Sequence, residues 1–302
     1  MVKNLVLENI SVGFKLPQGV FYAVGDVSLN LPGGNFTAII GESGCGKSVL
    51  GQAILNILPS GVVKKGRVLY NGEQVEKILS AFGIIPQNPS ESLNPVRKIG
   101  KQMQDILAVH NIADSGNSYK KQCLRLFGLQ EAERVLAAYP HELSGGMLQR
   151  VLCAMAVSSK PEWILADEPT KGLDEQVGAV VRKNLLTIKQ DLHLSMLIIT
   201  HDIALAQEVC DDVLVMYAGQ VLEHNADIWH KPLHPYTKGF LQALPKNGLQ
   251  VIPGKAPVPG ESFTGCKFAA RCPYCTERCK EEKPAMQQVG DAEVRCFLYA
   301  EG

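Results

Sequence analysis

The stretch AIIGESGCGKSVLGQAILNIL, residues 38–58, runs from an apolar strand through a glycine-rich turn into a helix. Its centre, residues 41–48, reads GESGCGKS and fits the pattern G-x-x-x-x-G-K-[ST]. Glycines let such a backbone curl until successive N–H groups point at phosphate oxygens, at the positive end of the following helix. A loop of this kind between a strand and a helix predicts a phosphate-binding site on an α/β fold.

Two side chains of this loop have predicted roles of their own. Lys47 would reach the β- and γ-phosphates, and the hydroxyl of Ser48 would ligate Mg²⁺. We therefore expect ATP and Mg²⁺ as ligands. The remaining phosphate contacts are expected from the loop residues Gly41, Ser43, Gly44, Cys45 and Gly46.

The bulk composition excludes some classes of function. Thirty basic and thirty acidic side chains cancel among 302 residues, which argues against a nucleic-acid binder that relies on a basic field. Residues 1–14 alternate apolar and polar side chains like a strand and lack the apolar core of a secretory signal. No stretch reaches the roughly 18 apolar residues that a membrane span needs. If the protein works at a membrane, another chain must supply the passage.

The pattern along the chain predicts strands that alternate with helices, which indicates a mostly parallel, doubly wound sheet. Residues 97–140 look mainly helical. From about residue 228, Pro and Gly recur and cysteines crowd together, so we expect a domain boundary there. The other expected elements are strands 3–10, 22–31, 35–40, 162–166 and 195–200 and helices 144–159, 175–191 and 203–210.

Acidic and histidine side chains follow two of these apolar strands. PEWILADEPT (161–170) delivers Asp167 and Glu168 to the carboxyl end of a strand, where ligands bind in open α/β sheets. Asp167 can hold the magnesium shell, and Glu168 can polarise a water for attack on the γ-phosphate. SMLIITHD (195–202) repeats this arrangement, with His201 and Asp202 at the tip of the strand. We predict that these strand ends border one catalytic crevice.

The stretch HELSGGMLQR (141–150) predicts a second anion-binding helix start. Ser144 can cap the helix, and Gly145 and Gly146 allow close backbone approach. One nucleotide hardly needs two such cradles from one subunit. The arrangement makes sense if each subunit offers this second cradle to the ATP held by its neighbour.

With these motifs in order from residue 14 to residue 202, the sequence resembles the ATP-binding subunit of an ABC transporter. The resemblance implies a P-loop NTPase core with an antiparallel β-subdomain and an inserted helical subdomain at about 95–158. It places the ATPase domain at 1–227 and a small Cys-rich C-terminal extension at 228–302.

The same resemblance assigns roles to single residues. Phe14 is the first candidate for the aromatic that stacks on adenine, with Tyr22 second. Gln87 matches the glutamine that touches magnesium and senses the transmembrane subunits, and His201 matches the switch histidine that acts with Glu168 and Lys47. The remaining matches are the signature at 143–147, which holds Ser144, Gly145 and Gly146, and the loop at 172–174, whose Asp174 contacts the opposing subunit.

With Met147 in place of the usual glutamine, the signature is similar to that of one of the two ATPase types in importers of the oligopeptide, dipeptide and nickel branch. The stretch HKPLHPYTKGFLQALP (230–245) resembles the start of the C-terminal region in the same branch. The branch implies transmembrane permease subunits, a second ATPase of the Gln type in a heterodimer, and indirectly a solute-binding protein outside the cell. It also implies a peripheral position on the cytoplasmic face of the inner membrane. A soluble ABC ATPase without a permease, in assembly or repair, is the alternative, and the cargo stays open.

Five cysteines crowd into the last part of the chain. In a cytosolic protein thiols stay reduced, so a dense group indicates a metal site. By spacing alone, CPYCTERC (272–279) would include Cys275. The family pattern, which in some members holds a [4Fe–4S] cluster, leaves Cys275 out. Zinc and free or disulfide-bonded thiols are the alternatives. The four ligands implied by the resemblance are Cys266, Cys272, Cys279 and Cys296.

Overall fold

The computed structural model describes residues 3–17, 19–74, 78–258, 261 and 263–300. The chain forms two compact units, each assembled from separate stretches of sequence. Unit 1 consists of Met1–Asn4, Pro32–Phe36 and Glu76–Val209. Unit 2 consists of Leu5–Leu31, Thr37–Val75 and Cys210–Gly302. The expected boundary at residues 227/228 falls inside unit 2.

Unit 1 contains three neighbouring parallel strands, β6 (Phe82–Ile85), β7 (Trp163–Asp167) and β8 (Ser195–Ile199). Every residue of β8 is buried, as are the first four residues of β7. Strands buried on both faces read as continuous apolar runs, which explains why these two were visible in the sequence. Their parallel direction sends all three carboxyl ends to one edge.

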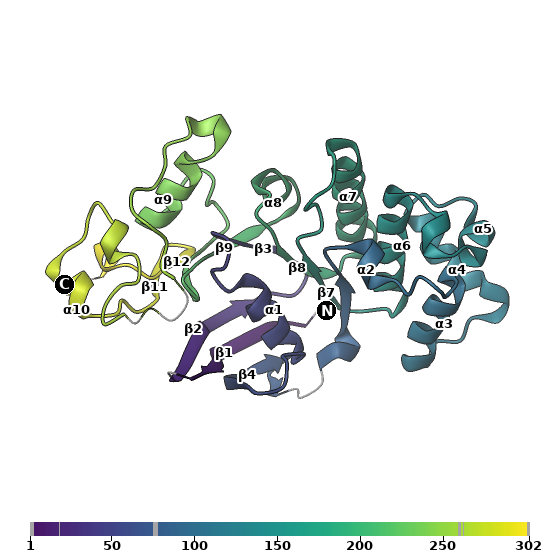
Figure 1. Cartoon of the computed structure of the whole chain (residues 1–302), viewed down its shortest axis with the longest axis horizontal. Coiled ribbons are helices and arrows are strands. Elements are labelled where there is room, and N and C mark those ends of the chain that lie inside the picture. Colours follow the sequence, from purple (N-terminus) through teal and green to yellow (C-terminus); the bar gives the residue numbers. More distant parts are fainter. Residues whose placement is uncertain (1–2, 18, 75–77, 259–260, 262, 301–302) are drawn as a thin grey trace. The chain divides into compact units, whose positions relative to one another are not determined.

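The helices of unit 1 are mostly short, and Figure 1 shows four of them, α3 to α6, grouped together. The longest of the four, α6, carries the predicted signature at its start. In chain order, the helices are α2 (Pro89–Ser92), α3 (Ile99–Val109), α4 (Ser118–Leu126), α5 (Ala132–Ala137), α6 (Gly145–Ser158), α7 (Glu175–Thr187) and α8 (Ile203–Val209).

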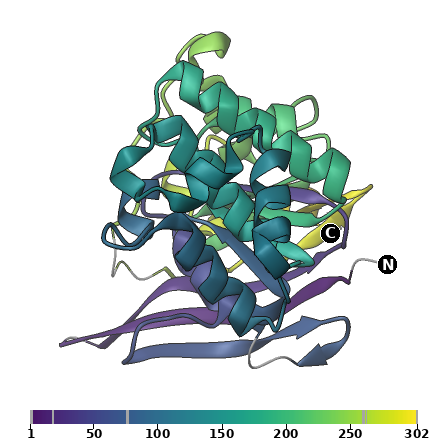
Figure 2. The ribbon, with the colours of Figure 1, turned by 90° about the vertical axis from the view of Figure 1, so that its right-hand side faces the viewer.

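Unit 2 contains an antiparallel sheet in the order β2-β1-β4-β5. Figure 2 shows its long strands side by side, in purple and blue. A helix, α1 (Lys47–Leu55), packs against β1 and β2. The bounds of the strands are β1 (Leu5–Leu16), β2 (Gly19–Leu31), β4 (Val62–Tyr70) and β5 (Glu73–Gln74).

A second group of strands in unit 2 joins the phosphate loop to the end of the chain. The strand before the loop, β3 (Phe36–Ile40), pairs in parallel with β9 (Asp212–Tyr217). From β9 the ladder continues antiparallel through β10 (Gln220–Asn225), β12 (Ala292–Val294) and β11 (Gln287–Val289). The extension, residues 228–302, also holds α9 (Pro235–Gln242) and α10 (Glu277–Glu281).

Most elements expected from the sequence are present within a few residues, and the differences have local causes. The helix expected at 175–191 ends as α7 at Thr187 and continues as a π-helical turn, Ile188–Leu192, that closes at His193 with a φ of 52°. Strands β4, β5, β6 and β9 to β12 were not expected. Among them, β4 carries charged side chains in its middle, and β6 is only four residues long.

Candidate functional site

The phosphate loop between β3 and α1 depends on two glycines that no other residue replaces without strain. Gly41 has a φ of 147°, and a Cβ there would lie 2.1 Å from the carbonyl oxygen of Met216. Gly46, with a φ of 103°, caps α1, and its Cβ would lie 2.4 Å from the carbonyl oxygen of Ala23. The loop therefore lies directly against the backbone of two neighbouring segments.

Within the loop, the side chain of Lys47 is folded onto the backbone. Its Nζ donates hydrogen bonds to the carbonyl oxygens of Gly41, at 2.9 Å, and Glu42, at 3.1 Å. The thiol of Cys45 is buried, and this burial raises its pKa, so it stays protonated at neutral pH. In contrast, Ser43, Gly44 and Ser48 are exposed, which leaves that side of the loop accessible to a ligand.

The two aromatic candidates for the adenine site lie on the β1–β2 hairpin. Phe14 pairs with Phe21 across the two strands and is half-buried. Tyr22 lines a cavity of about 280 Å³ together with Gly44 of the phosphate loop and Phe263 of the extension. Phe14 is not among the described residues that line this cavity. The structure therefore places Tyr22, the second candidate, beside the loop.

In unit 1, the predicted catalytic residues follow the carboxyl ends of adjacent strands. The register pairs Ile85 of β6 with Ala166 of β7, and Asp167 of β7 with Ile199 of β8. Gln87, two residues beyond β6, is exposed. The order of the strands therefore brings Gln87, Asp167, Glu168 and His201 to one edge of this unit.

Glu168 and His201 are in direct contact across that edge. The backbone N–H of Glu168 donates to the carbonyl of Ile199 at 2.7 Å, and a φ of 49° turns the residue out of the strand. Its carboxylate contacts Nδ1 of His201 and accepts from the backbone N–H of the same residue at 3.4 Å. Left-handed backbone in a residue other than glycine stores strain, which is found at functional sites. This arrangement can pass a proton between the carboxylate and the imidazole.

Sequence reasoning missed a second link between the same loops. Thr170 donates through its Oγ1 to Oδ2 of Asp202 at 3.1 Å. The other oxygen of Asp202 accepts from the N–H of Leu205 at 3.0 Å, at the start of α8. Asp202 thus ties the loop after β7 to the loop after β8. The only local signal was an acidic residue directly before a helix, which by itself indicates a cap.

Two further predicted residues cap helices. Ser144 accepts from the N–H of Met147 at 3.3 Å at the start of α6, and Asp174 accepts from the N–H of Val177 at 2.9 Å at the start of α7. A Cβ added at Gly145 or Gly146 would meet no atom within 4 Å. The two glycines at the start of α6 are therefore not crowded by other parts of the described chain at their Cα positions.

Comparison with known proteins decides the family. The description of the ABC transporter family matches residues 24–171. The chain is 34% identical to the oligopeptide transport ATP-binding protein OppD of Haemophilus influenzae, with 98% of each chain covered. It is 36% identical to the dipeptide transport ATP-binding protein DppD of Escherichia coli, over 95% of this chain and 94% of the relative. The chain belongs to the ABC transporter family.

Solved structures agree with this membership. The dimeric ATP-binding cassette MJ0796, bound to ADP and phosphate after hydrolysis, superposes with a TM-score of 0.62 at 26% identity. The match covers 74% of this chain and 98% of that chain. The expected ABC ATPase fold is thereby confirmed. As an ABC ATPase, the protein binds ATP with Mg²⁺ and hydrolyses it. None of the helices in the described ranges is long and apolar enough to pass through a membrane.

A second family description, that of the oligopeptide/dipeptide transporter C-terminal region, matches residues 222–279 of this ABC ATPase. The extension contains a cavity of about 170 Å³ that all four predicted thiols line. Cys275 is not among its described lining residues, and the Cys275 thiol instead contacts the carbonyl of Thr276 at 3.5 Å. The four lining thiols are those of Cys266, Cys272, Cys279 and Cys296.

Burial favours the protonated form of three of the thiols that line this cavity. Burial raises the pKa of Cys266 to about 11, with smaller contributions from the neighbouring cysteines, and burial also raises the pKa of Cys272 and Cys296. In the described part of the chain, no group of three or more His, Cys, Asp or Glu side chains is arranged to hold a metal ion. The donor types suit a thiolate-bound metal, but their positions do not converge on one point.

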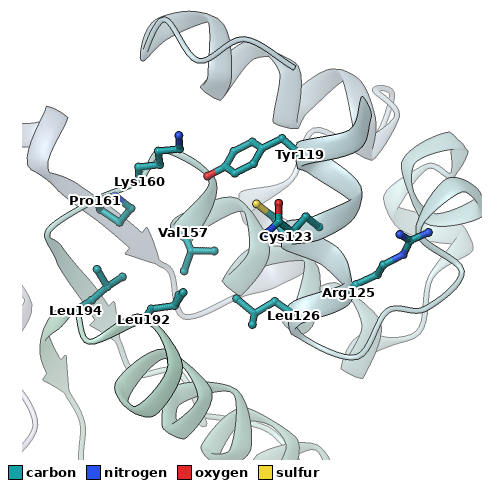
Figure 3. A pocket seen from close by; sticks show the side chains of 10 residues that line it. Tyr119, Cys123, Arg125, Leu126, Val157, Lys160, Pro161, Leu192 and Leu194 are labelled. Carbon is teal, nitrogen blue, oxygen red and sulfur yellow. The ribbon is translucent and has the colours of Figure 1, made fainter. Parts of the chain in front are cut away.

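A larger cavity of about 580 Å³ lies in unit 1 (Figure 3). Leu126 and Leu192 contribute to its apolar wall. The hydroxyl of Tyr119 donates to the carbonyl of Ser158 at 3.2 Å, and the ammonium of Lys160 lies 5.3 Å from the centre of the Tyr119 ring. The hydroxyl of Tyr119 thus has its partner within the protein, and the described lining of the cavity contains none of the residues predicted to bind ATP.

Proposed function

We propose that this ABC ATPase powers the import of peptides by driving transmembrane permease subunits. The observation that carries the proposal is the match to peptide-transport ATPases along nearly the whole chain, with the extension included. Nickel transport, which the sequence left open, receives less support because the relatives compared above are peptide transporters. The protein would act from the cytoplasmic face of the cell membrane without crossing it.

In the proposed site, the phosphate loop holds ATP. Lys47 contacts the β- and γ-phosphates, while Ser48, Gln87 and Asp167 complete the shell of Mg²⁺. Glu168 polarises the attacking water, and His201 steadies its carboxylate and the developing charge. The contact between Nδ1 of His201 and the Glu168 carboxylate supports this division of work.

Each site would be completed by a second ATPase subunit. The start of α6 would close over the γ-phosphate held by the partner, and Asp174 would contact the opposing subunit. Because phosphoryl transfer depends mainly on positioning and electrostatics, half of such a site should be slow. We further propose that the partner is a paralogue of the Gln type, in a heterodimer, since Met147 replaces glutamine in the signature of this chain.

Replacing Glu168 by glutamine tests the catalytic assignment in the isolated permease complex. ATP hydrolysis should fall at least about 100-fold, because a positioned general base contributes roughly 10²–10⁴-fold. ATP binding should persist, and the ATPase subunits purified without the permease should accumulate as closed dimers, measured by size exclusion. Glu162→Gln is the matched control, since Glu162 lies at the opposite end of β7 in an exposed ion pair with Lys3 at 3.0 Å.

Two results would overturn parts of this proposal. Wild-type hydrolysis rates in Glu168→Gln would reject the role of that carboxylate. Copurification without any permease subunit, together with unchanged peptide uptake in cells that lack the protein, would favour the soluble ABC ATPase without a permease. Uptake of labelled dipeptide and of nickel ions in the same cells separates the two cargo classes.

The thiol-lined cavity supports a second, finer proposal, that the extension binds a [4Fe–4S] cluster through Cys266, Cys272, Cys279 and Cys296. Binding would require these four thiols to lose their protons and approach one another, since they do not converge as placed. Iron and acid-labile sulfide should be found after anaerobic purification. Zinc in a colourless protein would favour the zinc alternative. If neither iron nor zinc is found, the cysteines are free or disulfide-bonded thiols.

Paired serine variants test the choice of ligands. Cys279→Ser should lose the iron because Cys279 lines the cavity, whereas Cys275→Ser should keep it because Cys275 does not. Iron content per chain is the measurement. Equal losses in the two variants would show that the ligand set is wrong.

A further inference from the structure

The second residue of the phosphate loop, Glu42, is held by three side chains. Lys47, from within the loop, donates to its carbonyl oxygen at 3.1 Å. The other two groups come from the extension. Arg271 donates through Nη1 to both carboxylate oxygens, at 3.1 and 3.2 Å, and the hydroxyl of Tyr236 accepts from the backbone N–H at 3.1 Å. The extension therefore contacts both the side chain and the main chain of Glu42.

Arg271 is fixed in place by its own surroundings. Its side chain is only 8% exposed, and Nε donates to the carbonyl of Pro253 at 3.1 Å. Nη1 also donates to the hydroxyl of Tyr217 at 3.3 Å, and the guanidinium carbon lies 6.0 Å from the centre of the Phe268 ring. Ion pairs with little exposure and fixed geometry resist screening and are costly to break from one side. The ion pair with Glu42 is thus a rigid contact.

Tyr236 is equally constrained. It is fully buried, and its ring lies 4.6 Å from that of Tyr217 and 5.5 Å from that of Phe268. Its backbone N–H donates at 3.0 Å to Nδ1 of His234, which caps α9. Phe268 and His234 also line the thiol cavity. One layer of aromatic side chains therefore separates that cavity from the phosphate loop.

We infer that Arg271 and Tyr236 are positioning residues for the phosphate loop, through which the extension sets the affinity for ATP. The inference goes beyond the proposed function, and it rests on the ATP site at this loop. A lysine that moves to phosphate oxygens must give up its bonds to the carbonyls of Gly41 and Glu42. Arg271 and Tyr236 contact the carboxylate and the N–H of Glu42, a residue that is not among the expected phosphate contacts, so they can hold Glu42 in place while Lys47 moves.

The test compares the binding of a fluorescent ATP analogue, mant-ATP with Mg²⁺, in purified full-length variants. Arg271→Met should raise the Kd about tenfold because it removes the ion pair and keeps the length of the side chain. Arg271→Lys keeps the charge but loses the fork of donors, so it should recover part of the affinity. Lys280→Met is the control, because it removes an exposed ion pair with Glu277, at 2.7 Å, in the same extension.

A double-mutant cycle separates positioning from a general loss of structure. If Arg271 acts through Glu42, the variant Glu42→Gln with Arg271→Met should bind mant-ATP no more weakly than the worse single variant. Glu42→Gln also serves if Arg271→Met does not fold. A Kd within twofold of wild type in a folded Arg271→Met or Glu42→Gln protein would overturn the inference, and so would additive effects in the cycle. Absence of mant-ATP binding in the wild type would instead reject the ATP site itself.

Discussion

Glu223 is a buried carboxylate in β10, just before the extension, and its replacement by glutamine gives a quantitative test of how the extension is held. It is 0% exposed and makes three hydrogen bonds. One oxygen accepts from the amide of Asn225 at 3.0 Å and from the N–H of Leu233 at 2.9 Å. The other accepts from the N–H of His234 at 2.8 Å.

The size of the effect follows from this geometry. A glutamine can place its carbonyl oxygen where two bonds are made, but its NH₂ group then faces the N–H of His234. One bond to a charged acceptor is lost, and one buried donor is left unsatisfied, each of which costs roughly 1–3 kcal/mol. Burying an amide is cheaper than burying a carboxylate, which offsets part of this cost. We expect Glu223→Gln to lower the free energy of unfolding by about 2–3 kcal/mol.

The assay is urea unfolding followed by tryptophan fluorescence. The chain has two tryptophans, so a Trp163→Phe background leaves Trp229, four residues before Leu233, as the reporter. Glu293→Gln is the control, since Glu293 is 37% exposed and lies 3.4 Å from His224, a contact worth at most about 1 kcal/mol. Equal losses in the two variants, or a loss below about 1 kcal/mol for Glu223→Gln, would refute the reasoning.

Two other perturbations test the fold around the site. The pKa of His224 is raised because its hydrogen bonds and charge interactions with Asp212 and Glu293 outweigh its burial. Protonated His224 therefore stabilises the fold fully below about pH 6.5, and this stabilisation is lost as the pH rises through the raised pKa. Unfolding free energies at pH 6 and 8.5 should therefore differ more in wild type than in His224→Gln; equal differences would contradict this. Gly41→Ala should lower the free energy of unfolding by about 3 kcal/mol or more, because its Cβ would meet the Met216 carbonyl. Gly44→Ala should lower it by only about 1–2 kcal/mol, because Gly44 has a φ of 77° but open space around a Cβ. Equal losses in urea unfolding would reject this difference.

The parts of the structure that could be predicted from the sequence are those set by local pattern. The buried runs of β7 and β8 and the glycine-rich loop each carry their signal within about ten residues. Strand β4 escaped because Lys64, Lys65 and Arg67 interrupt its alternation, even though it pairs along most of β1. Its place in the sheet depends on a partner about 55 residues away, and no local window contains that information.

The same distinction separates the site residues. Glu168 and His201 were predicted because each follows an apolar strand, and the contact between them follows from the pairing of β7 with β8. Spacing alone would have grouped Cys275 with the other thiols, since Cys275 lies three positions from Cys272. The structure leaves Cys275 out of the cavity lining, because lining depends on how the segment folds back toward Cys296 rather than on sequence distance.

The contact of Arg271 with Glu42 joins residues 229 positions apart, and the loop motif itself explains why it went unseen. The phosphate pattern constrains glycines, a lysine and a hydroxyl, and it leaves the side chains at the other positions unspecified. Those positions therefore leave their side chains free for other contacts. In this chain the carboxylate of Glu42 binds Arg271 of the extension, so one residue belongs to a loop common to many ATPases and also contacts the extension. A motif search treats that position as arbitrary, and only the structure shows that the chain uses it to connect its Cys-rich end to its phosphate loop.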